Sequence, residues 1–321
     1  MFGFIEILKA IAAILITNSH FGHIWPSSAM ATGGMLGDVI FFAVSGFCLY
    51  NLKQSFPIWY LKRIFRIYPV VWLVTAISLL VGLVSIGNAW DSVKLFVYPT
   101  YYHFIGSIML LYIFYYIFLF LHHRFGVKLQ YIMIAVFAAE IICYLFVFDR
   151  SVYKIDVVED YMAKFLFMES MLAGAFFRER INNGKRNGSI AGAVIALVIS
   201  VVLYFASAFS FRRYAALSQF QIISHIVTFA FVIALLNLFV LLEEKNRIRL
   251  DNPFGKVIKL LSKMTLEIYL VQYLVYYLLP SIMFPLNLVV TILLILISAF
   301  AVHFVCNFIT KHLNKLLEQI A

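Results

Sequence analysis

The sequence predicts an all-α, polytopic membrane protein: a bundle of about ten transmembrane helices. Apolar residues make up 64% of the 321 residues and charged residues only 12%, whereas soluble domains contain about 25% charged residues. The mean hydropathy is positive. About ten apolar stretches are long enough to cross a bilayer core as helices. These observations exclude a soluble enzyme and indicate a chain embedded in a membrane.

The predicted spans follow one another along the whole chain. They cover residues 4–21, 36–52, 70–87, 99–121, 130–148, 162–177, 189–209, 220–242, 260–279 and 286–309. The longest connections reach 17 residues, as in 243–259, and we find no tandem repeat, heptad run or low-complexity linker. We therefore expect residues 1–321 to form a single membrane-embedded domain, with its function inside the bundle or at one of its two mouths.

Basic residues are distributed unevenly over the connections. With the N-terminus in the cytoplasm, 17 of the 25 lysines and arginines lie in cytoplasmic connections and the C-terminal tail. Six lie on the opposite side, and Lys9 and Lys263 lie within or at the edge of spans. This positive-inside bias predicts that both termini are cytoplasmic. It also explains the net charge of +10 without nucleic acid as a partner. The first residues lack a basic leader and a cleavage site, so we expect the first helix to be retained.

The cysteines do not indicate a metal site. Cys48, Cys143 and Cys306 all lie inside predicted spans and show no paired spacing. A disulfide framework or a metal centre requires such spacing. We therefore expect three packing residues and no metal.

The first predicted span carries three ionisable residues on one side. At 100° per residue, the steps from Lys9 to His20 amount to about three turns plus 20°, and Glu6 lies one turn before Lys9. Ionisable groups inside a membrane are costly and usually functional. An imidazole suits a general base that takes a proton from an attacking hydroxyl. In the alternative interpretation, His20 is hydrogen-bonded to a neighbouring helix and Lys9 is a snorkelling anchor; the shared side favours function.

The second span combines small and polar residues. Asp38 opens it, and Ser45 and Gly46 lie near its middle. Small residues allow helices to approach closely, but Gly46 could also open the backbone at a narrow donor tunnel, with Ser45 supplying a hydroxyl. Spacing does not separate these interpretations. We do not expect Ser45 to be a covalent nucleophile, because the sequence indicates no His–Asp partner for it.

A basic run follows the second span. Arg63 and Arg66 share one side of the chain if the run is helical, with Lys62 beside them. Guanidinium groups bind phosphate oxygens in a bidentate manner. Ordinary positive-inside charge would give the same pattern, so both interpretations stay open.

Other ionisable residues lie within later spans, and each is more often a packing residue than a catalyst. Glu169 and Glu267 are the two with the best claim to a function, because both lie near the middle of a span. The remaining members of this group are Glu140, His103, His225 and His303.

Three of these motifs together resemble the membrane acyltransferase-3 family, integral-membrane O-acyltransferases of bacteria and some eukaryotes. The first is Lys9 followed by His20, the second is Phe41-Phe-Ala-Val-Ser-Gly-Phe47, and the third is Arg63-Ile-Phe-Arg66. They occur in the family's order and at family-like spacing. A late segment, Leu266 to Gln272, looks like a further family motif in which many members carry His where this chain has Gln272. We therefore assign no proton transfer to that position.

The resemblance implies transfer of an acyl group, usually acetyl, from cytoplasmic acyl-CoA to a hydroxyl of an extracytoplasmic glycan. His20 would be the catalytic base, and Lys9, paired with Glu6, would line the path to it. The donor side would comprise the cations that hold coenzyme A phosphates and the small residues of the second span: Lys62, Arg63, Arg66, Ser45 and Gly46. The carboxylate that orients His20 stays open, and the candidate supporting residues are Asp38, Glu169, Glu267, Tyr269 and Gln272.

The resemblance thus implies a membrane-bound O-acyltransferase, of the class that transfers groups other than aminoacyl groups, in the bacterial plasma (inner) membrane. We expect acetyl-CoA as the donor substrate, and a cell-surface polysaccharide or lipid-linked glycan as the acceptor. Membrane lipids would be further partners, and no metal would be involved. The alternative is a carrier that exports a glycan or a small anion. Carriers often contain internal repeats, which this sequence lacks.

Overall fold

The computed structural model describes residues 2–158, 160–184, 188–279 and 283–320. Over these residues the chain is all-α and contains no strand, which confirms the predicted fold class. Lys185 and Arg186, two of the cations counted as cytoplasmic, lie outside the described residues. The predicted orientation of the termini stays a prediction.

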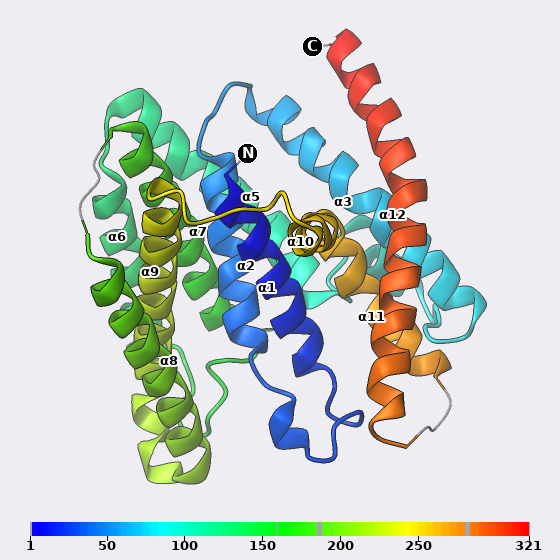
Figure 1. Ribbon diagram of the computed structural model, residues 1–321, viewed down its shortest axis with the longest axis horizontal. Coiled ribbons are helices and arrows are strands. Elements are labelled where there is room, and N and C mark those ends of the chain that lie inside the picture. The colour runs from blue at the N-terminus through cyan, green and yellow to red at the C-terminus, as the bar shows by residue number, and fades with distance from the viewer. Residues whose placement is uncertain (1, 159, 185–187, 280–282, 321) are drawn as a thin grey trace. The chain divides into compact units, whose positions relative to one another are not determined.

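Helices follow one another along the described chain (Figure 1). Their bounds are α1 Gly3–Ser19, α2 Gly34–Leu49, α3 Phe56–Leu80, α4 Ala89–Ser92, α5 His103–Phe125, α6 Leu129–Phe146, α7 Tyr161–Asn182, α8 Ile190–Arg213, α9 Ile222–Glu244, α10 Pro253–Lys263, α11 Thr265–Leu278 and α12 Leu286–Ile320. Three short helical turns lie at Ser28–Met30, Val93–Val97 and Ala215–Phe220.

Seven segments of the described chain are long and apolar enough to cross a membrane. They are Ser28–Leu49, Phe56–Leu80, His103–Phe125, Leu129–Phe146, Ile190–Arg213, Ile222–Glu244 and Leu286–Gln319. The sequence predicted about ten spans, and each of the ten overlaps a helix. The chain is therefore a membrane protein with several apolar helices, and the count of ten stays a prediction.

The helices form two compact units. The first unit comprises Met1–Lys9, Asp38–Leu52 and Leu111–Ile258, and the second comprises Ala10–Gly37, Lys53–Leu110 and Lys259–Ala321. Each unit is described by itself below. The expectation of a single domain over residues 1–321 stays a prediction.

In the first unit, α7 packs against α6 and α9, and α8 packs along α9 (Figure 1). Helix α7 also touches α2 through glycines. A Cβ built on Gly46 would lie 1.9 Å from the carbonyl oxygen of Met171, and one on Gly174 would lie 1.9 Å from that of Ala43. The rings of Phe42 and Phe167 stack at 4.4 Å beside this contact. The two helices approach this closely because both positions lack a side chain.

In the second unit, α12 (orange to red in Figure 1) packs against both α3 and α11. The hydroxyl of Thr310 donates to the carbonyl of Phe65 at 3.0 Å, which joins α12 to α3. At the other end of α12, the buried Asn287 amide donates to the carbonyl of Ile24 at 2.8 Å. This bond attaches the loop after α1 to α12.

Several helix ends differ from the prediction. Helix α3 begins at Phe56 instead of residue 70, so Lys62, Arg63 and Arg66 lie within a helix and not in a connection. The prediction was wrong here because a hydropathy pattern treats cations as loop residues, although Lys and Arg are good helix formers. The span predicted at 260–279 is two helices, α10 and α11, separated at Met264. Helix α12 continues well beyond residue 309.

Candidate functional site

His20 lies directly after the last residue of α1, in the second unit. Its backbone N–H donates to the carbonyl of Thr17 at 3.1 Å, so the residue extends the last turn of the helix. Its imidazole Nε2 lies 3.1 Å from the hydroxyl of Tyr273 on α11. The two rings meet edge to face with centroids 5.0 Å apart. The side chain named as the base therefore has one defined polar partner.

The loop that carries His20 is fixed by Asn18. The Asn18 amide donates to the carbonyls of Met30 and Thr32 at 2.9 and 3.0 Å, and its oxygen accepts from the Trp25 indole at 2.9 Å. These bonds join the end of α1 to the loop that precedes α2. They hold the turn in place, so the position of His20 does not depend on Tyr273 alone.

Helix α11 presents an aromatic side towards this region. Tyr269 and Tyr273 are one helical turn apart, with ring centroids at 6.1 Å, and Phe104 packs against Tyr269 at 5.3 Å. The predicted supporting residue Tyr269 is thus next to the partner of His20. The sequence analysis missed Tyr273. Its spacing of four residues from Tyr269 is the signal that could have identified it.

Gln272 is fully buried. Neither its side-chain nitrogen nor its oxygen has a hydrogen-bond partner among the described residues. The structure therefore shows no polar link from Gln272 to His20.

Arg66 belongs to a polar cluster in the second unit. Its Nη1 lies 3.7 Å from Oε1 of Glu267, and its Nη2 donates to the carbonyl of Lys263 at 3.1 Å. His303 on α12 contacts the same Oε1 through Nδ1 at 2.9 Å. The exposed fractions of these side chains are 40% for Arg66, 18% for His303 and 0% for Glu267. The structure therefore pairs Glu267 with Arg66 and His303, while Tyr273 contacts His20.

Three cations lie close together on α3. Lys62, Arg63 and Arg66 are all half-buried. The Arg63 guanidinium lies over the indole of Trp59, 4.9 Å from the ring centroid. The Arg66 side chain is 40% exposed, and a guanidinium has five N–H donors. The side of α3 that carries these residues can therefore bind an anion.

The remaining predicted site residues lie in the first unit. Asp38 is buried and Ser45 is half-buried. Helix α2 continues unbroken through Gly46, whose carbonyl accepts from the Tyr115 hydroxyl at 2.6 Å. The structure therefore shows close packing of helices at Gly46, which is the first of the two interpretations. Donor binding by Ser45 and Gly46 stays a prediction.

Glu6 and Lys9 are half-buried residues of α1 that belong to the first unit. The predicted alignment of this pair with His20 stays a prediction.

Glu169 belongs to a buried cluster in the first unit. It lies beside Glu140, and Glu140 Oε1 lies 2.5 Å from His225 Nδ1. The other imidazole nitrogen, Nε2, lies 3.1 Å from the carbonyl of Ile155. The sequence analysis expected Glu140 and His225 to be packing residues with satisfied polar groups. Both nitrogens of His225 have partners, whereas Glu140 Oε2 has no hydrogen-bond partner among the described residues.

No group of three or more His, Cys, Asp or Glu side chains in the described part of the chain could hold a metal ion. Cys48, Cys143 and Cys306 form no disulfide with one another. The second unit contains an apolar cavity of about 270 Å³ between α1, α11 and α12. Its lining includes Phe21 and Trp25, which follow His20 in the chain.

The chain matches the family model described as an acyltransferase domain, that of the acyltransferase-3 family, over residues 2–308. It belongs to this family. The match covers nearly the whole chain, including all three motifs of the sequence analysis, and it confirms the resemblance stated there. No curated protein and no solved structure matches the chain. The protein is therefore a membrane protein of an acyltransferase family.

Proposed function

We propose that this acyltransferase-3 protein moves an acyl group, expected to be acetyl, from cytoplasmic acyl-CoA to a hydroxyl of an extracytoplasmic polysaccharide or glycolipid. The setting would be a bacterial plasma membrane. The observation that carries the proposal is the family match over residues 2–308, which includes the ordered motifs around His20, Ser45–Gly46 and Arg63–Arg66. The geometry of the second unit supports it.

In this proposal His20 is the general base. Its imidazole takes the proton of the acceptor hydroxyl while the oxygen attacks the thioester carbonyl. The carbon–sulfur bond then breaks, the acyl group remains on the acceptor oxygen, and the proton passes to the departing coenzyme A thiolate. Tyr273 acts as a positioning residue, because its hydroxyl lies at Nε2 and fixes the orientation of the ring. Lys9 and Glu6 would line the path to the base.

The donor would be held through its phosphates by Lys62, Arg63 and Arg66 on α3. Glu267 and the carbonyl of Lys263 fix the guanidinium of Arg66 at one end. With 40% of its side chain exposed, Arg66 can still present donors to a phosphate. Glu267, which also contacts His303, is thus a positioning residue for Arg66.

The cavity between α1, α11 and α12 supports a lipid-linked acceptor. It is apolar, and Phe21 and Trp25 place it beside the loop that carries His20. A hydrocarbon chain gains free energy by occupying such a lining, and its glycan head would then be close to the base. A free polysaccharide would make no use of this cavity.

The thermal stability of the purified protein with and without acetyl-CoA tests the donor assignment. A ligand that binds only the folded state stabilises it by about 2.7 kcal/mol at 100 times its Kd. We expect acetyl-CoA to raise the Tm of the wild type and to have little effect on the Arg63→Ala, Arg66→Ala double variant. S-acetylpantetheine lacks the nucleotide phosphates, so it should stabilise neither protein.

Because Arg66 also pairs with Glu267, the double variant can be less stable before ligand is added. The quantity to compare is therefore the change in Tm on adding ligand. Lys256→Ala, a change to an exposed lysine of α10, is the control that removes a cation and should keep the full response. No response of the wild type at saturating acetyl-CoA would contradict the donor assignment and favour the carrier.

A further inference from the structure

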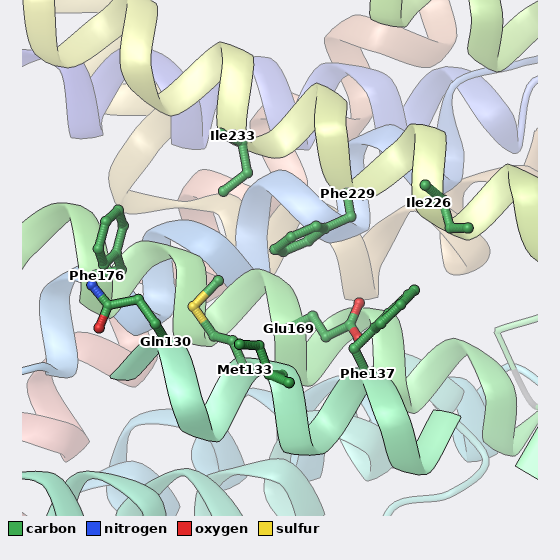
Figure 2. Close-up of a pocket in the computed structure, with 9 residues that line it drawn as sticks. Gln130, Met133, Phe137, Glu169, Phe176, Ile226, Phe229 and Ile233 are labelled. Atoms are coloured by element: carbon green, nitrogen blue, oxygen red, sulfur yellow. The ribbon is translucent and has the colours of Figure 1, made fainter. Parts of the chain in front are cut away.

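Exposed apolar side chains occur on helices of two kinds. Phe137 of α6 and Ile226 of α9, which line the apolar cavity in Figure 2, belong to helices that are long and apolar enough to cross a membrane. Contact with lipid chains explains their exposure. Helix α10 is different, because its 11 residues rise only about 16 Å, whereas a bilayer core is about 30 Å thick. The exposed apolar residues of α10 therefore need another explanation.

Helix α10 begins close to the end of α9, which is long and apolar enough to cross a membrane. In the last turn of α9, the Glu243 carboxylate accepts from the backbone N–H groups of Gly3 and Phe4 at 2.9 and 3.0 Å. A Cβ built on Gly3 would lie 3.6 Å from the Leu250 side chain, and one on Gly255 of α10 would lie 2.5 Å from the Leu250 backbone. The chain between α9 and α10 therefore stays beside the end of α9, and α10 begins near a membrane surface.

Helix α10 carries its three lysines on one side. They are Lys256, Lys259 and Lys263. At about 100° per residue they lie within about 60° of one another around the helix axis. Because α10 is one continuous helix, this arrangement follows from its own backbone. The helix contains no acidic residue, so it presents a positively charged side.

The exposed apolar residues of α10 lie on a second side. Phe254 is 73% exposed, Val257 52% and Leu260 43%. The centre of this side lies about 125° around the axis from that of the lysines. Gly255 and Ser262 are buried and lie on a third side, which faces the protein. A short helix with an apolar side and a basic side is typical of the plane of a membrane interface, where the apolar residues reach the acyl chains.

The segment before α10 adds to the positive charge. Residues 245–263 contain six lysines and arginines and one acidic residue, Asp251. Lys245, Arg247 and Arg249 precede the helix and are exposed. Clusters of about 4–8 cations beside a membrane-spanning helix or on an amphipathic helix attract anionic lipids. The charge of this segment is therefore complementary to an anionic membrane surface.

We propose that α10 lies in the membrane interface and binds anionic phospholipids. Phe254, Val257 and Leu260 lie among the acyl chains, and the lysines contact the head-group phosphates. A soluble anion would leave the apolar side in water, and a zwitterionic lipid carries a cation that the lysines repel. An anionic lipid satisfies both sides of the helix. This proposal does not rest on the proposed acyl transfer.

The depth of two neighbouring positions tests the placement of the helix. Nitroxide labels are attached to Phe254→Cys and to Lys256→Cys in the full chain, with its three native cysteines replaced by alanine, in bilayers that contain phosphatidylglycerol. These positions point about 160° apart. We expect the label at position 254 to collide more with oxygen, which dissolves in lipid, and the label at position 256 to collide more with a water-soluble nickel chelate. Equal access of the chelate to both labels would place the apolar side in water, where a protein can cover it, and would overturn the proposal.

Lipid titrations of the full chain, with its cysteines intact, test the basic side. Native mass spectrometry measures the binding of dioleoylphosphatidylglycerol, and dioleoylphosphatidylcholine is the matched zwitterionic lipid with the same chains. We expect the wild type to bind phosphatidylglycerol more tightly. The Lys256→Gln, Lys263→Gln double variant should bind it about 30-fold more weakly, the equivalent of about 1 kcal/mol per lysine.

A matched variant removes the same charge elsewhere. Lys311→Gln, Lys315→Gln removes two exposed lysines of α12, and it should keep the preference for phosphatidylglycerol. Equal losses in the two double variants would show that net charge and not α10 attracts the lipid, which would overturn the proposal, as would a wild type without a preference. None of these measurements uses acyl transfer, so failure here is distinguishable from failure of the proposed function.

Discussion

Each unit of this protein contains a buried glutamate paired with a histidine, and the two pairs differ in exposure. In the first unit, Glu140 and His225 have 0% exposed side chains. In the second unit, Glu267 is equally buried, but its partners His303 and Arg66 are 18% and 40% exposed. A pair in which both side chains are fully buried has no surface to offer a ligand, so we expect it to stabilise the fold. A pair that includes an exposed cation can also bind a ligand. We therefore expect substitutions of Glu140 and His225 to affect stability, and those of Glu267 and Arg66 to affect donor binding as well.

The largest effect should come from His20→Ala. General-base catalysis contributes about 10²–10⁴-fold, so acyl transfer to the proposed glycan acceptor should fall by that factor while the protein still accumulates in the membrane. His23→Ala is the matched control, because His23 is an exposed residue of the same loop. Acyl esters at normal levels in stably expressed His20→Ala would show that the second unit's imidazole is not the base.

The two glutamates provide the next comparison. Glu140→Ala leaves His225 buried without its partner, and breaking a buried pair costs about 3–5 kcal/mol. Glu267→Ala should cost less, about 1–3 kcal/mol, because the exposed Arg66 and His303 can be solvated. Thermal unfolding of the purified proteins measures both, and the double variant Glu140→Ala, His225→Ala should recover part of the loss. Equal losses of stability for the two glutamate variants would show that the exposure of the partner residues does not determine the cost.

The sequence predicted the helices better than it predicted these pairs. Long apolar stretches determine that a helix exists, because each must bury its backbone polar groups within a membrane. The beginning of α3 was predicted wrongly. Hydropathy assigns Lys62, Arg63 and Arg66 to a connection, but these residues lie within the helix. The pairs escaped prediction because Glu140 and His225 are 85 residues apart, and Glu267 and His303 are 36 residues apart. Only the packing of helices brings such residues together.

A glycine substitution tests whether the first unit depends on close packing. In Gly46→Ala, the new Cβ would lie 1.9 Å from the Met171 carbonyl oxygen, a backbone atom that cannot move away alone. Overpacking typically costs about 1–3 kcal/mol, and we expect the upper end. Gly192→Ala on α8 is the control, since among the described residues its Cβ would meet no atom closer than 3.8 Å. A Tm of Gly46→Ala as high as that of the control would mean that the contact between α2 and α7 is not needed for stability.

The smallest effect should come from Tyr273→Phe, which removes one hydroxyl from the second unit. Losing a hydrogen bond worth about 1 kcal/mol corresponds to about a fivefold decrease in kcat, with little change in Tm. Tyr277→Phe is the control on the same helix, because among the described residues its hydroxyl makes a long, exposed contact of 3.5 Å with Gly82.

The pH profile separates positioning from simple packing. Burial lowers the pKa of His20 below 6.5, and the base is active when neutral, so acyl transfer should rise with pH through that pKa. For His20 to take a proton at Nδ1, its Nε2–H donates to the Tyr273 hydroxyl, and this bond stabilises the protonated imidazole more than the neutral one. Removal of the hydroxyl should therefore lower the pKa and move the rising limb of the profile to lower pH. A Tyr273→Phe protein that is slower but has an unshifted profile would show that the tyrosine only fills space beside His20.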